Sequence, residues 1–289
     1  MTTTTPASSI PTAICELVKV ASMGGGRGIS LTSQPRGSLG AQGKPFEIFA
    51  KNMFAECLGA LSSHVDAAWE RTFSWRGSAN HPPDFMIRGG DAVEVKVHGG
   101  VGQIQLNSSP PKRTLKVTDP RIQDGCRTCE DWSERDFLYF IGKANEEFVE
   151  ALWLIDGTCI ADNANTYDMI FDKLALTVTD LGGEPGNEIG RLNNVDPLRA
   201  TSLRIRAMWL LEHPARVFQS VLLPPEHGSF VLNVLVSADK WDSYSNEEVA
   251  AVTALSGNGL NVQRIEIPDS GALGQQQEAV HVSWKVDVN

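Results

Sequence analysis

Two carboxylates and a lysine stand close together in one short stretch of the chain. Pro83-Asp84 is followed ten residues later by Glu94-Val95-Lys96. Carboxylate oxygens are hard ligands that Mg²⁺ accepts, and the backbone carbonyl of Val95 can join them. A bound Mg²⁺ polarises a phosphoryl group and lowers the pKa of a bound water, while Lys96 could position that water or offset charge on the phosphate. This set of residues suits hydrolysis of a phosphodiester by in-line attack.

A short hairpin is the element that must position these groups. Phe85–Ile87 and Ala92–Val97 are apolar runs typical of strands, and the Arg88-Gly-Gly-Asp91 stretch between them is a strong turn signal. Glu94 and Lys96 are two residues apart, so they project from one face of the second strand. We therefore expect two carboxylates and an ammonium to converge at one end of the hairpin.

The same residues also have an ordinary interpretation. Pro-Asp is a frequent turn dipeptide, and Glu-x-Lys on a strand is often a solvated ion pair. Two features favour catalysis: charges in an apolar strand are costly unless they are used, and the hairpin joins Asp84 to Glu94 directly.

The wider block resembles the NgoPII-type family of type II restriction endonucleases, within the PD-(D/E)XK nuclease superfamily. The resemblance is strongest over about residues 70–160 and continues more weakly to about residue 240. The segments that carry it are Gly77-Ser-Ala-Asn80, Pro82-Pro-Asp84, Gly89-Gly-Asp-Ala-Val-Glu-Val-Lys96, Leu106-Asn-Ser-Ser-Pro110, Asp119-Pro-Arg-Ile122 and Cys126-Arg-Thr-Cys-Glu-Asp-Trp132.

The resemblance implies a fold, a reaction and a set of roles. The fold is α/β, a PD-(D/E)XK restriction-endonuclease-like core with a central mixed β-sheet flanked by helices. The reaction is Mg²⁺-dependent cleavage of double-stranded DNA by a homodimer at a short palindrome, GGCC in the best-known relatives. Asp84 and Glu94 would be metal ligands together with the carbonyl of Val95, and Lys96 would be the catalytic lysine.

A further acidic residue often comes from the helix before the hairpin in this superfamily. Glu47, in a helix that begins at Pro45, is the candidate. A glutamate in the first turn is also favoured by the helix dipole alone, so both interpretations stay open.

Polar and basic residues on both sides of the hairpin are candidate DNA contacts. Gln and Asn can pair with base edges, while Ser, Lys and Arg suit phosphates. The alternative is an ordinary polar loop. The candidates are Arg76, Asn80, Gln103, Gln105, Asn107, Ser108, Ser109, Lys112 and Arg113.

Other motifs carry less information. Arg204 and Arg206 share one face of a predicted strand and are either a base-reading pair or a charged sheet face. Cys126-x-x-Cys129 lacks the second ligand pair that zinc requires, so we interpret both cysteines as plain thiols. Gly24–Gly28 lacks the Gly-Lys-Ser/Thr ending of a P-loop, and we expect no nucleotide cofactor.

Composition limits the classes further. The chain has 289 residues, 42% of them hydrophobic and 21% charged, as in ordinary globular proteins. No apolar run approaches the roughly 18 residues that a membrane span needs. With five scattered cysteines and no secretory signal, we expect no membrane partner and the cytoplasm of a prokaryote.

Charge is unevenly distributed along the chain. The net charge is −10, but residues 1–128 carry 14 Lys/Arg against 10 Asp/Glu, a net of +4. Residues 129–289 carry 11 Lys/Arg against 25 Asp/Glu, a net of −14. An acidic total does not forbid a local basic surface, so the first half is where DNA is expected.

The pattern along the chain predicts one large domain. Residues 1–44 are read as an N-terminal helix, Ile10–Met23, with a flexible Gly/Ser-rich segment that carries Arg27 and Arg36. Residues 45–289 are read as a single nuclease domain with the catalytic hairpin at 83–97. Further helices are expected at Pro45–Leu61 and Glu247–Leu255, and further strands at Phe137–Ile141, Ala151–Ile155, Leu203–Leu211, Phe230–Val236 and Val280–Val288.

Two other functions remain open from the sequence. One is a repair or structure-specific nuclease on the same core. The other is a sequence-specific DNA-binding protein that has lost activity, although the presence of Asp84, Glu94 and Lys96 counts against it.

Overall fold

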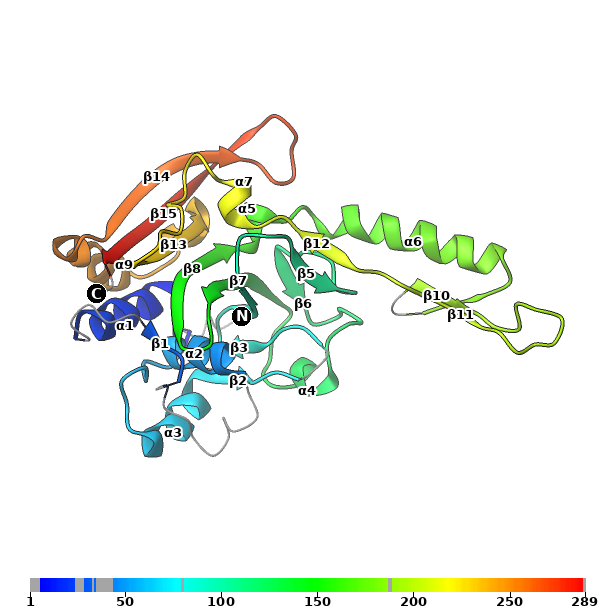
Figure 1. Cartoon of the computed structure of the whole chain (residues 1–289), viewed down its shortest axis with the longest axis horizontal. Helices are drawn as coiled ribbons and strands as arrows, with labels where there is room; N and C mark the ends of the chain where they lie inside the picture. The colour runs from blue at the N-terminus through cyan, green and yellow to red at the C-terminus, as the bar shows by residue number, and fades with distance from the viewer. Residues whose placement is uncertain are drawn as a thin grey trace.

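A mixed β-sheet forms the body of the protein in the computed structural model, which describes residues 6–23, 29–32, 34, 44–78, 81–186 and 189–287 (Figure 1). β4 runs parallel to β7 and β13 runs parallel to β8, while the other pairs are antiparallel. The α/β prediction is therefore confirmed. The strands in spatial order are β14 (Asn261–Pro268), β15 (Gln276–Asp287), β13 (Ser229–Ser237), β8 (Phe148–Asp156), β7 (Glu134–Ala144), β4 (Ala92–His98), β3 (Phe85–Ile87) and β2 (Phe73–Trp75), with β1 (Ile29–Ser30) on β8 and β6 (Thr114–Lys116) on β7.

Helices cover the sheet and connect its strands. None in the described part of the chain is long and apolar enough to cross a membrane. They are α1 (Ile10–Met23), α2 (Pro45–Phe54), α3 (Ser62–Thr72), α4 (Asp124–Arg127), α5 (Gly157–Ile160), α6 (Ala164–Asp180), α7 (Pro214–Val217), α8 (Ala238–Asp242), α9 (Asn246–Ala254) and the 3₁₀ turn η2 (Leu255–Asn258).

The central strands bury both faces. Leu138 and Phe140 of β7 point into one core, while Phe137, Tyr139 and Ile141 point into the other. The first core is closed by α1, α2, α3 and α9. The second is closed by short elements that include α4, α5 and a two-stranded ribbon of β5 (Ile104–Asn107) and β12 (Trp209–Leu211). Apolar runs rather than strict alternation mark such doubly covered strands.

Two predicted helices have different bounds in the structure. The helix from Pro45 ends at Phe54 rather than Leu61, and Glu56 then takes a positive φ of 52°. The prediction extended the helix because Cys57 continues the apolar stripe, yet that side chain is buried from the turn that follows. The predicted helix at 247–255 is α9, which begins with a capping box formed by Ser245 and Glu248.

A long arm projects from the body (Figure 1). We define the arm as residues 162–208 without 187–188; it holds α6 and a three-stranded sheet of β9 (Glu184–Pro185), β10 (Ile189–Leu192) and β11 (Leu203–Arg206). The predicted strand Leu203–Leu211 is wrong as one element, because it divides into β11 in the arm and β12 against β5.

Most of the predicted Gly/Ser-rich segment, with Arg27 and Arg36, lies outside the described residues, as does Asn80. The helix that precedes it, α1, packs into the first core through Ile10, Ile14 and Leu17.

Candidate active site

The predicted hairpin is present and fixes Asp84 beside β4. β3 and β4 pair antiparallel across the Arg88–Asp91 turn. Asp84 directly precedes β3, and its Oδ2 accepts a hydrogen bond of 2.7 Å from the backbone N–H of Val95. The hairpin thus places β4 beside the Asp84 carboxylate, as the sequence predicts.

Glu94 and Lys96 share the face of β4 opposite Val95. Lys96 Nζ donates to Glu94 Oε1 at 2.7 Å, and both side chains are largely buried, with 23% and 13% of the lysine and glutamate exposed. Val95 packs against the first core instead. The alternation of the strand therefore separates the polar groups from the packing that holds them in place.

Burial makes the two carboxylates interact strongly. Loss of solvent and the nearby Glu94 raise the pKa of Asp84 to about 7, against the opposing effects of Lys96 and the Val95 N–H. Burial alone would lower the pKa of Lys96, but Glu94 and Asp84 outweigh it and raise that pKa. The site therefore favours a bound positive charge.

One carboxylate oxygen of this site is suited to be a ligand of a cation. Glu94 Oε2 is buried and has no hydrogen-bond partner among the described residues, and a buried polar atom left in that state normally has an unseen partner such as an ion or water. No three His, Cys, Asp or Glu side chains in the described ranges cluster to hold a metal. Mg²⁺ does not need such a cage, since it is bound through one or two carboxylates and keeps several waters.

Glu47 lies near the site on α2 but already has a partner. Its Oε1 accepts from Lys51 Nζ at 2.6 Å, and the same ammonium donates to the carbonyl of Arg76 at 2.9 Å. Glu47 is the smallest of the named contributions that raise the pKa of Asp84. Helix α2 thus places a third carboxylate close enough to affect Asp84, and Lys51 holds that carboxylate in position.

The hairpin of β3 and β4 forms part of a cleft of about 1160 Å³. Asp84, Glu94 and Lys96 line the cleft on the body side. Three predicted DNA contacts line the same wall: Asn107, Ser108 and Ser109. Asn107 ends β5 with a positive φ of 52°, a conformation that Asn tolerates better than most residues.

Five predicted DNA contacts do not line this cleft. Arg76 and Gln105 are exposed elsewhere, and Gln103 donates to Glu212 at 3.3 Å. Lys112 is buried in a 2.5 Å ion pair with Asp119. The fifth is Arg113.

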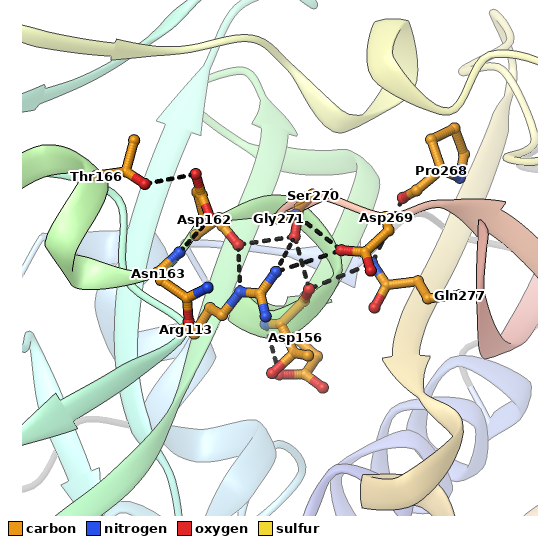
Figure 2. A network of polar contacts seen from close by, with 12 residues as sticks. Arg113, Asp156, Asp162, Asn163, Thr166, Pro268, Asp269, Ser270, Gly271 and Gln277 are labelled. Atoms are coloured by element: carbon orange, nitrogen blue, oxygen red, sulfur yellow. Dashed lines mark hydrogen bonds and ion pairs between the residues drawn. The ribbon is translucent and has the colours of Figure 1, made fainter. Parts of the chain in front are cut away.

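Arg113 joins distant segments of the body (Figure 2). Its Nε donates to the carbonyl of Ala161 at 2.7 Å, and a terminal nitrogen donates to Ser270 Oγ at 3.0 Å and lies 3.5 Å from Asp269. These bonds connect the loop between β14 and β15 to the base of the arm.

The opposite wall of the cleft belongs to the arm. It carries Arg191, Arg204 and Arg206, together with Glu184. The sequence indicates Arg204 and Arg206 only as either a base-reading pair or a charged sheet face, and it gives no signal for Arg191. The spacing of Arg204 and Arg206, two residues apart, is the available signal in the sequence. Nothing in the sequence places these arginines opposite the hairpin.

The cysteine pair contacts its neighbours by weak hydrogen bonds. Cys126 Sγ lies 3.3 Å from Met86 Sδ, and Cys129 Sγ donates to the carbonyl of Cys126 at 3.0 Å. Burial raises the pKa of Cys126 to about 12. The interpretation of the pair as plain thiols stays a prediction.

Comparison with known proteins matches the site to one family. The model of the NgoPII restriction endonuclease family matches residues 10–268. The type II restriction enzyme NgoPII of Neisseria gonorrhoeae is 30% identical over 245 residues, which cover 83% of this chain and 87% of that enzyme. No solved structure matches. The chain therefore belongs to the NgoPII restriction endonuclease family and is a site-specific deoxyribonuclease that acts on phosphodiester bonds.

Proposed function

We propose that this enzyme hydrolyses double-stranded DNA with Mg²⁺, as a homodimer, at a short palindrome for which GGCC is the expected sequence. The observation that carries the proposal is the convergence of Asp84, Glu94 and Lys96 on one wall of the cleft, with Glu94 Oε2 buried and unpartnered in the described structure. The resemblance to the NgoPII family supports the metal, the palindrome and the sequence.

Asp84 and Glu94 are the proposed metal ligands, with the carbonyl of Val95. When bound, Mg²⁺ would polarise the phosphoryl group and acidify a water. The two carboxylates are held before any metal arrives, because Val95 fixes one and Lys96 the other. Pre-organised ligands lose less freedom on binding.

Lys96 is proposed to act through its charge. Its raised pKa keeps the ammonium protonated, which favours orienting the attacking water and stabilising charge on the phosphate over removing a proton. Glu47 is proposed as an auxiliary acidic group, whose contact with Lys51 sets its position on α2.

The body wall is proposed to hold DNA beside the scissile phosphate. Asn107, Ser108 and Ser109 are suited to this because they share the cleft with Lys96 and can donate to phosphate oxygens. The roles of Arg76, Asn80, Gln103, Gln105, Lys112 and Arg113 at DNA stay predictions. For Lys112 and Arg113, the internal ion pairs would have to rearrange for the charges to reach a phosphate.

Digestion of unmethylated phage DNA, with Mg²⁺ and with chelator, tests the proposal when fragment ends are sequenced. We expect discrete fragments that share one palindromic end sequence and vanish with chelator. Cuts at many unrelated sequences, or only at branched or damaged DNA, would point to a repair or structure-specific nuclease. Binding without cutting in Mg²⁺ would point to an inactive DNA-binding protein.

A further inference from the structure

Three arginines form a row on the arm sheet. β10 and β11 pair antiparallel, with Arg191 opposite Arg204 and Ile189 opposite Arg206. Cross-strand partners project from the same face of a sheet, as do residues two apart. The three guanidinium groups therefore share one face, and all three residues line the cleft.

The other face of this sheet is covered by α6. Gly190 lies opposite Ile205, and a Cβ added to Gly190 would come within 2.6 Å of the Val178 side chain of α6. The glycine thus allows the helix to pack closely against one side of the sheet. The arginine face is left to the cleft.

Charge follows the same division. Residues 189–206 hold four Arg and one Asp, a net of +3, while α6 holds three Asp and one Lys, a net of −2. In a chain with a net charge of −10, this local excess of arginine stands out, and it faces the two carboxylates and the lysine across the cleft. Such a basic wall favours a polyanion.

We propose that the ribbon of β10 and β11 enters the major groove of the DNA, and that Arg204 and Arg206 read guanine edges there. A two-stranded ribbon fits the major groove, and the arginine fork donates two parallel hydrogen bonds to guanine O6 and N7. Base reading is assigned to the two arginines of β11 because β11 is an edge strand of the arm sheet, whereas Arg191 lies on the middle strand opposite Glu184 of β9. This inference rests on the proposed function and extends it to the origin of specificity.

The base of the arm is anchored firmly enough to support this role. The guanidinium of Arg121, a body residue of the cleft, stacks 4.7 Å from the ring of Phe171 on α6. Trp209 of β12 packs against Tyr167 and Phe171, with ring centroids 5.4 and 5.6 Å apart. These contacts hold the arginine face opposite the hairpin before DNA binds.

Arg204→Lys and Arg206→Lys test the inference because lysine keeps the charge but lacks the fork. Binding in Ca²⁺ would be measured on a short duplex with the site mapped for the wild type and on a scrambled duplex. We expect each variant to lose about 5- to 150-fold of its preference for the cognate duplex, with little change on the scrambled one. Lys173→Ala on α6 removes a charge from the covered side of the arm and should leave the preference unchanged.

Melting temperatures within a degree or two of the wild type would establish that the variants fold. Equal losses on both duplexes would mean that the arginines hold phosphates only, and no loss would mean that the arm does not contact the DNA; either result overturns the inference. If the wild type cuts DNA normally in both cases, the proposed function survives. A wild type that cuts no DNA in Mg²⁺ would overturn the proposed function and this inference together.

Discussion

At the scale of single residues, the two carboxylates of the site are only partly compensated by their neighbours. One hairpin brings Asp84 and Glu94 together in a largely buried place, where burial and then the charge of Glu94 raise the pKa of Asp84. Lys96 neutralises one oxygen of Glu94 and leaves the other, Oε2, buried without a described partner. A divalent ion would supply the positive charge that these oxygens lack, so we expect the carboxylates to bind one even in the absence of DNA.

Mg²⁺ should therefore stabilise the folded protein. An ion that binds only the folded state at 100 times its Kd adds about 2.7 kcal/mol, and the melting temperature should rise by several degrees over that in chelator. Glu94→Gln should abolish most of this rise because it removes a ligand charge. Asp131→Asn, an exposed carboxylate outside the cleft, is the matched control and should keep it. A full Mg²⁺ response in Glu94→Gln would remove Glu94 from the ligand set.

Asp84, Glu94 and Lys96 could be placed from the sequence because a tight turn joins them within one hairpin. Lys112 and Arg113 could not, although they follow soon after. Their orientation depends on Asp119 and on Ser270, the second of which is far away in the chain. Local spacing sets the first relationship, and only the tertiary fold sets the second.

At the scale of elements, the hairpin is supported by close packing between β7 and α2. Gly142 of β7 lies under the ring of Phe46, and a Cβ at that position would come within 2.1 Å of the ring. Phe46 is buried and precedes Glu47 in the chain. A glycine in this strand therefore sets how closely the helix with Glu47 approaches the sheet.

Gly142→Ala should destabilise the protein by about 1–3 kcal/mol, because overpacking forces α2 or the Phe46 ring to move. Urea unfolding would measure the change in the free energy of unfolding. Gly99→Ala is the matched control, since a Cβ there meets no atom within 4 Å. Equal free energies of unfolding for the two variants would show that α2 moves to accept the methyl group without a loss of stability.

A buried histidine on β15, the strand next to the β14 end of the sheet, should make stability depend on pH. Burial lowers the pKa of His281 from 6.5 to about 4, and the ring is hydrogen-bonded to Asn233 Oδ1 at 3.0 Å. The unfolded state binds more protons between these values, so stability that is complete above pH 6.5 is lost as pH falls toward 4. His281→Gln should flatten this loss, measured by urea unfolding from pH 7 to 4, whereas His64→Gln on the exposed face of α3 should not. Parallel pH curves for the wild type and His281→Gln would contradict the assignment.

Helices α1, α2 and α9 and the strands β3, β4, β7, β8, β13 and β15 could be predicted because their apolar positions match buried ones. The strand at Leu203–Leu211 could not be divided correctly, since two short apolar pieces in sequence gave no sign that they pair with different sheets. α6 was missed for a similar reason: among its described side chains only Val178 is fully buried, so the helix lacks the strong apolar stripe that a core-facing helix shows.

At the scale of the whole molecule, the cleft lies between the body and the arm. The first half of the chain supplies the hairpin with Asp84, Glu94 and Lys96, and the acidic second half supplies the facing arginines. The charge division along the sequence therefore does not coincide with the two walls. Both walls belong to one chain, so cutting both strands of the proposed palindrome would call for a second copy related by a two-fold axis.

Sedimentation of the enzyme on a duplex with its mapped site, in Ca²⁺, should give a complex that contains twice the 31.4 kDa chain mass. Addition of Mg²⁺ should then lead to cleavage of both DNA strands in a single binding event. A complex with a single chain, or a product nicked in one strand only, would contradict the homodimer.

Single-turnover cleavage by Lys96→Ala tests the central claim most directly, namely that Asp84, Glu94 and Lys96 form the catalytic centre. The wild type, Lys96→Ala and the distant surface variant Lys19→Ala would be compared on the mapped site in Mg²⁺, with binding measured separately in Ca²⁺. Loss of one charge-stabilising group costs about 10²–10³ in rate. We predict at least that loss for Lys96→Ala with affinity close to the wild type, and no change for Lys19→Ala. Cleavage by Lys96→Ala at the wild-type rate would contradict the account.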